Sequence, residues 1–267
     1  MFQFKEDEIK RYSRHIILPE VGGIGQRRLK EAKILVAGAG GLGSPASLYL
    51  AAAGIGLIGI IDMDIVDISN LQRQILHRTE DVGKEKTLSA ERALKDINPD
   101  INVKRYQKRI SADNIMNIIK DYDLVIDGVD NFPARYLLND ACFFLAKPLI
   151  DAGILKFDGQ LMTIIPDKGP CYRCIFPEPP PAGMVPSCQE AGILGAVAGI
   201  LGVLQATEAI KYILGKGNLL VGKILIFDAL SLTFRVININ RNKECPLCGI
   251  EPRIKELKEY NIKCEVN

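Results

Sequence analysis

Two pairs of cysteines stand far apart in the chain, each pair with two residues between its members. The first pair is Cys171 and Cys174, and the second is Cys245 and Cys248. Two C-x-x-C pairs form a tetrahedral zinc site when the fold brings them together. Because four thiolates leave no open coordination position, we expect a structural Zn²⁺ ion that ties two remote parts of one domain. A redox pair and unrelated thiols are the alternatives.

A glycine-rich segment lies between an apolar run at residues 33–37 and an alanine-rich stretch. Its sequence, GAGGLG, places five candidate nucleotide-binding residues in one turn: Gly38, Gly40, Gly41, Leu42 and Gly43. Glycines let the backbone approach a phosphate closely, and the N-terminus of the following helix offers unpaired N–H groups to an anion. Asp62 ends the next apolar run, where a carboxylate suits hydrogen bonds to ribose hydroxyls. These features predict a nucleotide site, and a tight turn without a ligand is the alternative.

Three charged residues favour ATP over NAD as the nucleotide. Arg73 and Lys86 can neutralise a triphosphate, and Asp130 follows an apolar run, where it can hold Mg²⁺ against phosphate oxygens. Nicotinamide chemistry needs no such combination. Taken singly, Arg73 and Lys86 are also explained as solvated surface charges, and Asp130 with Asn131 as a helix cap. The same segments supply three further nucleotide-binding candidates, Asp64, Asn70 and Asn131.

One further cysteine and two histidines have side chains that can take part in chemistry. Cys188 lies after a proline-rich stretch and just before an apolar helix, where a thiol can have a lowered pKa and act as a nucleophile. A helix-entry residue without chemistry is the alternative. His15 follows Arg14 and can lie near the nucleotide, whereas we expect His77 at the surface. Neither histidine has a pattern of partners for acid–base catalysis.

The elements that must position these residues alternate between apolar runs and amphipathic stretches. Strands are predicted at 33–37, 57–62, 101–106, 124–127, 148–151, 160–165, 224–228 and 233–239, the most apolar of them being 33–37, 57–62 and 124–127. Helices are predicted at 7–17, 25–32, 43–53, 84–96, 111–119, 133–144 and 192–214. This rhythm predicts a Rossmann-like α/β fold of three layers, with a mixed, mostly parallel sheet of about eight strands between helices. Small residues in the last helix, among them Gly195 and Gly202, suit either close core packing or a dimer interface.

The composition argues against two classes of partner. The 267 residues carry a formal net charge of +2, and Lys and Arg are spread along the chain, so we expect no nucleic acid partner. The most apolar stretch, residues 191–204, is shorter than the roughly 20 residues of a membrane span, so we expect no membrane partner. The acidic N-terminus lacks the pattern of a signal peptide, and paired thiols without one indicate a cytoplasmic protein.

Five motifs, in this order, resemble those of the MoeB/ThiF family of ubiquitin-activating-type adenylyltransferases. They are RYSRHIILPEVGGIGQRRL from Arg11 onward, GAGGLGSP, DMDIVDISNLQRQ, GKEK and DGVDNFPAR. The resemblance covers nearly the whole chain and implies a single domain, 1–267. Within it, we expect N-terminal helices at 1–32, a nucleotide-binding half at 33–152, and a carrier-binding and zinc half at 153–267.

The resemblance also implies roles for individual residues at the nucleotide. Asp62 would hold the ribose of ATP. Asn70, Arg73 and Lys86 would contact its phosphates, and Asp130 would bind Mg²⁺. The same family has the zinc site that the paired cysteines predict.

By the same resemblance, the enzyme adenylates the C-terminal glycine of a small ubiquitin-like sulfur-carrier protein that ends in Gly-Gly, in molybdopterin or thiamine biosynthesis. It would act as a homodimer in which Arg14 reaches the phosphates bound by the neighbouring subunit, and a separate protein would donate sulfur. Cys188 would link covalently to the carrier, as in some relatives, or be dispensable, as in others. Three alternatives stay open: an NAD-dependent oxidoreductase, a tRNA-base-modifying relative, and a zinc-stapled scaffold that binds a carrier without activating it.

Overall fold

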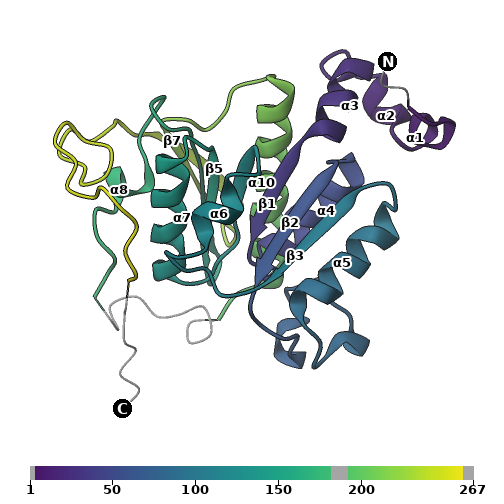
Figure 1. The fold of residues 1–267 in the computed structure, drawn as a ribbon, viewed down its shortest axis with the longest axis horizontal. Coiled ribbons are helices and arrows are strands. Elements are labelled where there is room, and N and C mark those ends of the chain that lie inside the picture. The colour runs from purple at the N-terminus through teal and green to yellow at the C-terminus, as the bar shows by residue number, and fades with distance from the viewer. Residues whose placement is uncertain (1–3, 182–191, 261–267) are drawn as a thin grey trace.

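The computed structural model describes residues 4–181 and 192–260, and Figure 1 shows their arrangement. The chain begins with three helices, α1 (Glu6–Arg11), α2 (Ser13–Ile16) and α3 (Gly22–Glu31). The predicted helix at 7–17 is therefore divided at Tyr12. The Tyr12 ring is buried, and its hydroxyl accepts a hydrogen bond of 2.8 Å from Asn98 Nδ2. Docking of this ring determines where the first helix ends.

Eight strands form one sheet, in the order β3-β2-β1-β4-β5-β6-β7-β8. Their bounds are β1 (Lys33–Ala37), β2 (Leu57–Asp62), β3 (Asn102–Gln107), β4 (Leu124–Asp127), β5 (Leu149–Leu155), β6 (Asp158–Ile164), β7 (Lys223–Asp228) and β8 (Thr233–Asn238). The first five strands in spatial order pair in parallel, and the pairs from β5 to β8 are antiparallel. The predicted mixed, mostly parallel sheet is confirmed.

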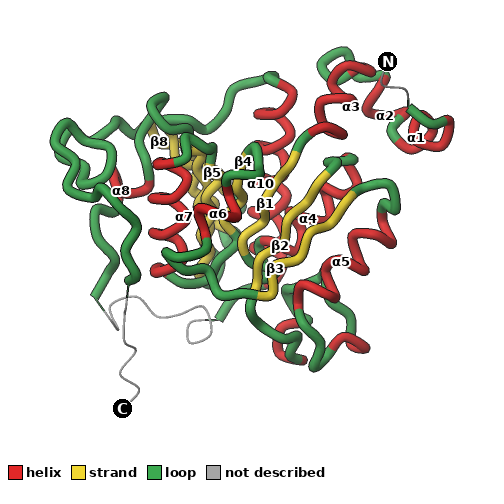
Figure 2. The backbone as a smooth tube through the Cα atoms, in the orientation of Figure 1, coloured by secondary structure: helices red, strands yellow, loops and turns green. Residues whose placement is uncertain are grey.

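Helices cover both faces of the sheet, as Figure 2 shows. One face packs against α4 (Gly43–Ala53), α5 (Lys86–Ile97) and α10 (Gly195–Leu214). The other face packs against α6 (Ile115–Ile119), α7 (Phe132–Phe144) and the segment that contains α8 (Tyr172–Ile175). Two short 3₁₀ helices, η1 (Ile68–Asn70) and η2 (Thr79–Asp81), lie between β2 and α5. This is the three-layer arrangement that the alternating pattern predicts.

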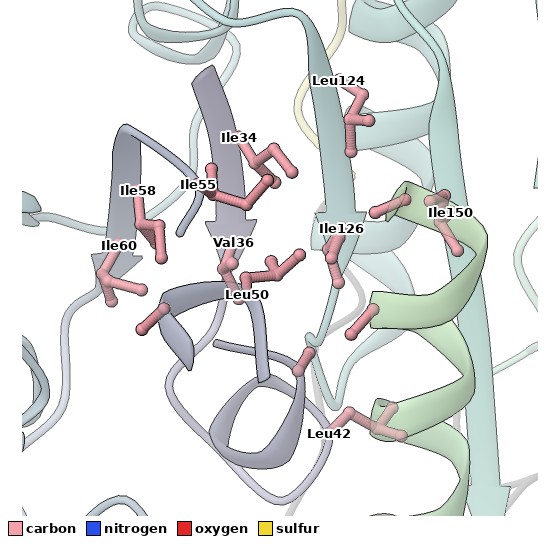
Figure 3. Close-up of a cluster of buried hydrophobic side chains, with 14 of the residues drawn as sticks. Ile34, Val36, Leu42, Leu50, Ile55, Ile58, Ile60, Leu124, Ile126 and Ile150 are labelled. Carbon is pink, nitrogen blue, oxygen red and sulfur yellow. The ribbon is translucent and has the colours of Figure 1, made fainter. Parts of the chain in front are cut away.

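The central strands β1, β2 and β4 are apolar on both faces because both faces are covered. The edge strands β3 and β8 carry exposed side chains. Alternate residues of β1 separate into two cores: Ile34 and Val36 belong to one, and Leu35 and Ala37 to the other. Figure 3 shows Val36 next to Leu50 of α4, and Ile34 next to Ile55. The side chains of β1, β2 and β4 pack in these shared cores. Because the three strands run parallel, their carboxyl ends lie at the same edge of the sheet.

Among the described residues, one helix, α10, is long and apolar enough in principle to cross a membrane. In this fold, α10 packs on the sheet and against α4. It also buries two polar side chains that make hydrogen bonds. Gln205 Nε2 donates to the carbonyl oxygen of Asp127, and Glu208 Oε2 accepts from Thr163 Oγ1. A Cβ atom at Gly202 would overlap the backbone of Leu42, so this small residue permits close packing inside the domain.

The order in which strands are added reverses at β1: β2 and β3 lie on one side of β1, and β4 lies on the other side. Ligands of open α/β sheets bind at such a switch point, beyond the carboxyl ends of the strands. The turns that follow β1 and β4 touch there, since a Cβ atom at Gly38 would lie 2.7 Å from the carbonyl oxygen of Gly128. The topology thus brings the glycine loop and the segment of Asp130 to one place.

Candidate nucleotide and metal sites

The glycine loop from Gly38 to Gly43 requires glycine at two positions for steric reasons. Gly38 has a φ of +95°, in the left-handed region, and packs against the backbone of Gly128. A Cβ atom at Gly43 would overlap the carbonyl oxygen of Gly38. The loop therefore makes a tight turn between β1 and α4. Its glycines have no side chains that would cover the backbone.

The N–H groups of the loop are available to a ligand. Within residues 4–181 and 192–260, those of Gly40, Gly41, Leu42 and Gly43 donate no backbone hydrogen bond. They stand at the N-terminus of α4, where the helix dipole places partial positive charge. This arrangement fits an anion such as a phosphate group.

Asp62 lies at the end of β2, beside the loop. Its Oδ2 accepts from the Ala39 N–H at 2.8 Å, and its Oδ1 accepts from the Asp64 N–H at 2.8 Å. Burial raises the pKa of the Asp62 carboxyl, while the charge of Lys86 and the two backbone hydrogen bonds oppose that rise. Each carboxylate oxygen keeps a second lone pair that can accept from a ribose hydroxyl.

Lys86 and Arg73 reach this edge from different elements. Lys86 begins α5, and its Nζ lies 2.9 Å from Asp64 Oδ2, with the side chain of Lys86 7% exposed and that of Asp64 55% exposed. Arg73 follows η1, and its Nη1 donates to the carbonyl oxygen of Ser69 at 3.0 Å. The Cγ atom of Arg73 lies 3.6 Å from the position of a Cβ atom on Gly41. Two positive charges therefore flank the loop.

Asn70, Asp130 and Asn131 lie in turns at the same edge. Asn70 Oδ1 accepts from the Asp67 N–H at 3.2 Å, and this bond helps to shape the turn before Arg73. Asp130 is exposed and accepts one long hydrogen bond, 3.4 Å, from Asn131 Nδ2. Asn131 caps α7, since its Oδ1 accepts from the Ala134 N–H. The carboxylate of Asp130 is thus open to a cation, whereas the amide oxygen of Asn131 already has a partner.

Arg14 is not part of this group within one chain. It is exposed on α2, and its neighbour Tyr12 packs against Gly54, at the end of α4 remote from the glycine loop. The 11 residues of α4 separate the two places by about 16 Å. Figure 1 shows α1, α2 and α3 beyond the edge where β1 and β2 begin. Cys188 lies outside the described residues.

The four paired cysteines come together on the α7 side of the sheet. Their sulfur atoms all lie within 4.8 Å of one another, with Cys171 Sγ 3.6 Å from Cys245 Sγ and Cys174 Sγ 3.3 Å from Cys248 Sγ. Four thiolates at 2.3 Å from a zinc ion would stand about 3.8 Å apart. The Asn242 N–H also points at Cys174 Sγ, and such a bond suits a thiolate ligand. The donor set and its size fit Zn²⁺.

The prediction that His77 lies at the surface is wrong. The side chain is buried, its Nδ1 lies 2.9 Å from Ser89 Oγ, and its Nε2 lies 3.0 Å from the carbonyl oxygen of Ala39. The sequence offered no sign of this, because residues 71–85 have no helical or strand period. His15, in contrast, contacts Gln26 Oε1 at 3.1 Å, away from the loop.

Two more polar groups near the edge were not foreseen. Gln74 is buried next to Gly40, and its Oε1 has no hydrogen-bond partner in the described part of the chain. Arg135 of α7 lies below the turn of Asp130, 3.1 Å from Asp151 Oδ1 and 3.7 Å from Asp127 Oδ2. The signal for this second cluster was an acid at the end of each of two predicted strands, 124–127 and 148–151, although β5 continues past Asp151 to Leu155.

Comparison with known proteins gives close relatives along the whole chain. A Thermus thermophilus protein named sulfur carrier protein adenylyltransferase is 48% identical over 267 residues, covering 98% of each chain. A Haloferax volcanii protein named SAMP-activating enzyme E1 is 48% identical over 242 residues, covering 91% of this chain and 89% of the relative.

Solved structures and a family model agree with these relatives. The crystal structure of E. coli MccB with MccA-N7isoASN is similar, with a TM-score of 0.77 and 27% identity, over 90% of this chain and 74% of MccB. The same enzyme with ATP gives a TM-score of 0.74 at 27% identity, over 90% of this chain and 73% of MccB. The model of the ThiF family matches residues 12–247. The chain therefore belongs to the ThiF family.

Proposed function

We propose that the chain uses ATP to adenylate the C-terminal glycine carboxylate of a small ubiquitin-like sulfur-carrier protein. One carboxylate oxygen of the carrier attacks the α-phosphorus of ATP. The bond from that phosphorus to the bridging oxygen of the β-phosphate breaks, and pyrophosphate leaves with the bonding electrons. The observation that carries the proposal is the set of loop N–H groups, Asp62, Arg73 and Lys86 at one edge of the sheet.

The site supplies the positive charge at the phosphates that this reaction would not have in water. A glycine carboxylate is ionised at neutral pH, so the nucleophile needs no strong general base. The difficulty is that an anion must approach a polyanion. The N-terminus of α4, the ammonium of Lys86 and the guanidinium of Arg73 place positive charge where the phosphates would lie. Asp62, with a lone pair left on each oxygen, would hold the ribose.

Two metal ions belong to the proposal. Asp130 would hold Mg²⁺, which supplies further positive charge to the phosphate oxygens. The sulfur atoms of Cys171, Cys174, Cys245 and Cys248 would hold a structural Zn²⁺. The zinc would join the segment after β6 to the segment after β8, without a part in the chemistry.

A homodimer would complete the site. Arg14 stands on a surface with large exposed apolar side chains, namely Ile17 and Leu18 after α2 and Ile24 in α3. Exposed apolar patches of this kind favour an interface between proteins. In a two-fold arrangement of two copies, each Arg14 would reach the phosphates bound by the partner. A separate protein would donate sulfur, and the pathway would be cytoplasmic synthesis of molybdopterin or thiamine.

The test is exchange of labelled pyrophosphate into ATP by the purified chain. The exchange is expected only with Mg²⁺ and with a carrier that ends in Gly-Gly, because the reverse reaction needs the acyl adenylate. A carrier that lacks its last glycine is the matched control and should support none. If no carrier from the source organism supports exchange, the proposed function is wrong.

A further inference from the structure

His77 is a buried ring directly beneath the glycine loop. Its Nε2 lies 3.0 Å from the carbonyl oxygen of Ala39, the residue between Gly38 and Gly40. Its Nδ1 lies 2.9 Å from Ser89 Oγ on α5. The ring therefore bridges the loop to α5, yet it is too deep to touch a ligand itself.

Ala39 is held at both of its backbone polar groups. Its N–H donates to Asp62 Oδ2 at 2.8 Å, and its carbonyl oxygen faces His77 Nε2. Each of these groups belongs to a different peptide plane. Asp62 thus orients the plane between Gly38 and Ala39, and His77 orients the plane between Ala39 and Gly40.

The second plane determines where the Gly40 N–H points. In a planar trans peptide, the C=O of one residue and the N–H of the next point in opposite directions. The described chain has no cis peptide, so the Gly40 N–H points away from His77. That N–H donates no backbone hydrogen bond among the described residues, and Gly40 is only half-buried. It therefore faces the open side of the loop.

The hydrogen-bond partners of the His77 ring determine which ring nitrogen carries hydrogen. The carbonyl oxygen of Ala39 can only accept, so Nε2 must carry hydrogen for the bond to exist. The Ser89 hydroxyl donates its one hydrogen to Asp81 Oδ2 at 2.8 Å. It can therefore donate to Nδ1 of a neutral ring only by giving up that bond, and it accepts from Nδ1 when the ring is charged. The charged groups around the ring are Lys86 on α5 and, through Ser89 Oγ, Asp81 of η2, which also pairs with Lys84 and Arg92.

We infer that His77 is a positioning residue of the nucleotide site, which turns the Gly40 N–H toward the anionic phosphates of ATP. The inference rests on the proposed function. The Ala39 carbonyl oxygen also accepts a long hydrogen bond, 3.5 Å, from Ser44 Oγ. Loss of the shorter bond from Nε2 leaves the plane between Ala39 and Gly40 held by that long bond, so the Gly40 N–H is less firmly directed at the phosphates. The consequence is weaker binding of ATP, with adenosine affected little because it has no phosphate.

Two substitutions of similar size separate this role from simple filling of space. The amide nitrogen of glutamine can take the place of Nε2, whereas asparagine is shorter and reaches only the place of Nδ1. For H77N, we expect the KM for ATP in pyrophosphate exchange to rise about tenfold, the effect of one hydrogen bond to a charged group. For H77Q, we expect a KM within about twofold of the unsubstituted chain, because the donor is restored. The inhibition constant of adenosine should stay the same in all three proteins.

The outcomes distinguish the inference from the proposed function. If the unsubstituted chain shows no exchange with any carrier, the proposed function fails before His77 is tested. If the chain is active but H77N and H77Q bind ATP as well as it does, or both weaken ATP and adenosine alike, His77 does not orient the loop. A ¹⁵N NMR spectrum of the unsubstituted protein gives a test without variants. Hydrogen on Nε2, in a neutral or a charged ring, supports the inference, and hydrogen on Nδ1 alone overturns it.

Discussion

Lys86 combines low exposure with a position beside the proposed phosphates. Its 7% exposed side chain has Asp64 as partner, and Asp64 is itself open to solvent. Replacing Lys86 by alanine removes a positive charge that would interact with the triphosphate of ATP at a site with little access to water. We expect K86A to lower the rate of carrier-dependent pyrophosphate exchange by about 10²–10³.

The matched control for that experiment is Lys84, two residues earlier. Its side chain is 44% exposed, and its Nζ lies 3.6 Å from Asp81 Oδ1. K84A should exchange pyrophosphate nearly as fast as the unsubstituted chain. Equal rates for K86A and K84A would contradict a role of Lys86 at the phosphates.

His77 also makes the stability of the fold depend on pH. Burial, together with the charge of Lys86, lowers the pKa of the His77 ring, and the contacts with Ala39 and Asp81 oppose this only in part. The unfolded chain, with an ordinary pKa of about 6.5, then binds the proton at higher pH than the folded chain does. Stability therefore falls as the pH drops below about 6.5, and the loss is complete below the folded-state pKa.

Urea unfolding on both sides of this range measures the effect. The free energy of unfolding of the unsubstituted chain should fall on acidification, and that of H77Q should fall less, because glutamine does not titrate. Carboxylates that contribute to both proteins cancel in the comparison. Equal acid sensitivity of the two proteins would contradict the lowered pKa.

At the scale of elements, the turn between β4 and α7 packs against a buried charged cluster. The cluster contains one guanidinium, of Arg135, and two carboxylates, of Asp127 and Asp151. Asp127 and Asp151 are neighbours in register on β4 and β5, and Arg135 lies closer to Asp151. Burial first, and the nearby Asp151 next, raise the pKa of Asp127 to about 8, despite the charge of Arg135. Asp127 Oδ1 accepts from the Val129 N–H, and Arg135 Nη2 donates to the Val129 carbonyl oxygen. The cluster therefore shapes the turn that carries Asp130.

Replacing Asp127 by asparagine tests this charge imbalance. In the folded chain the carboxyl keeps its proton up to a pH of about 8, whereas in the unfolded chain it releases it near its ordinary pKa. The folded state thus binds more protons between these values, and stability falls as the pH rises. D127N keeps an oxygen for Val129 but does not ionise, so its free energy of unfolding should fall less as the pH rises from about 4 to about 8. The exposed acid Asp121, as D121N, is the control and should leave the slope over this range unchanged.

The cysteine cluster joins two segments that the sheet alone does not hold together. Cys171 precedes α8 and Cys174 lies within it, whereas Cys245 and Cys248 follow β8. We expect about one zinc ion per chain by elemental analysis, and much less in C248S, which loses one of four thiolates. C142A removes a buried thiol on α7 outside the cluster and should keep its zinc. C248S should also unfold at lower temperature, and full zinc content in C248S would contradict the assignment.

At the scale of the whole molecule, Arg14 and the nucleotide edge are separated by the length of α4. A contribution of Arg14 to catalysis therefore requires a second copy. Mixtures of inactive variants test this directly. In a two-fold dimer, R14A and K86A subunits each supply what the other lacks at one of the two sites. We expect an equal mixture, after subunit exchange, to recover about one quarter of the unsubstituted activity, since half of the dimers carry one complete site.

The control mixture combines R73A with K86A. Both residues come from the same chain in each site, so no combination of subunits makes a complete site, and activity should stay low. If the mixture of R14A and K86A also stays inactive, Arg14 does not act across a subunit interface.

Much of this protein is determined by local features of its sequence. Each buried parallel strand is a short apolar run, so the strands were predicted within a few residues, and the glycine spacing identified the loop before α4. The four cysteines of the candidate zinc site were also recognisable, because the spacing within each C-x-x-C pair is a local property. Asp62 was recognisable because it ends such a run.

The tertiary structure decided what depends on contacts between segments far apart in the chain. Strand order and register place Asp127 beside Asp151, and neither strand reveals this alone. His77 is buried only because the irregular segment after η1 folds under the glycine loop, and burial of a polar ring leaves no period in the sequence. The same holds for Arg14: its residue type suits a phosphate, but the packing of Tyr12 against the far end of α4 places it at the opposite edge. Local chemistry is encoded by neighbours along the chain, whereas the distance between two sites is set by the sheet and the helices that separate them.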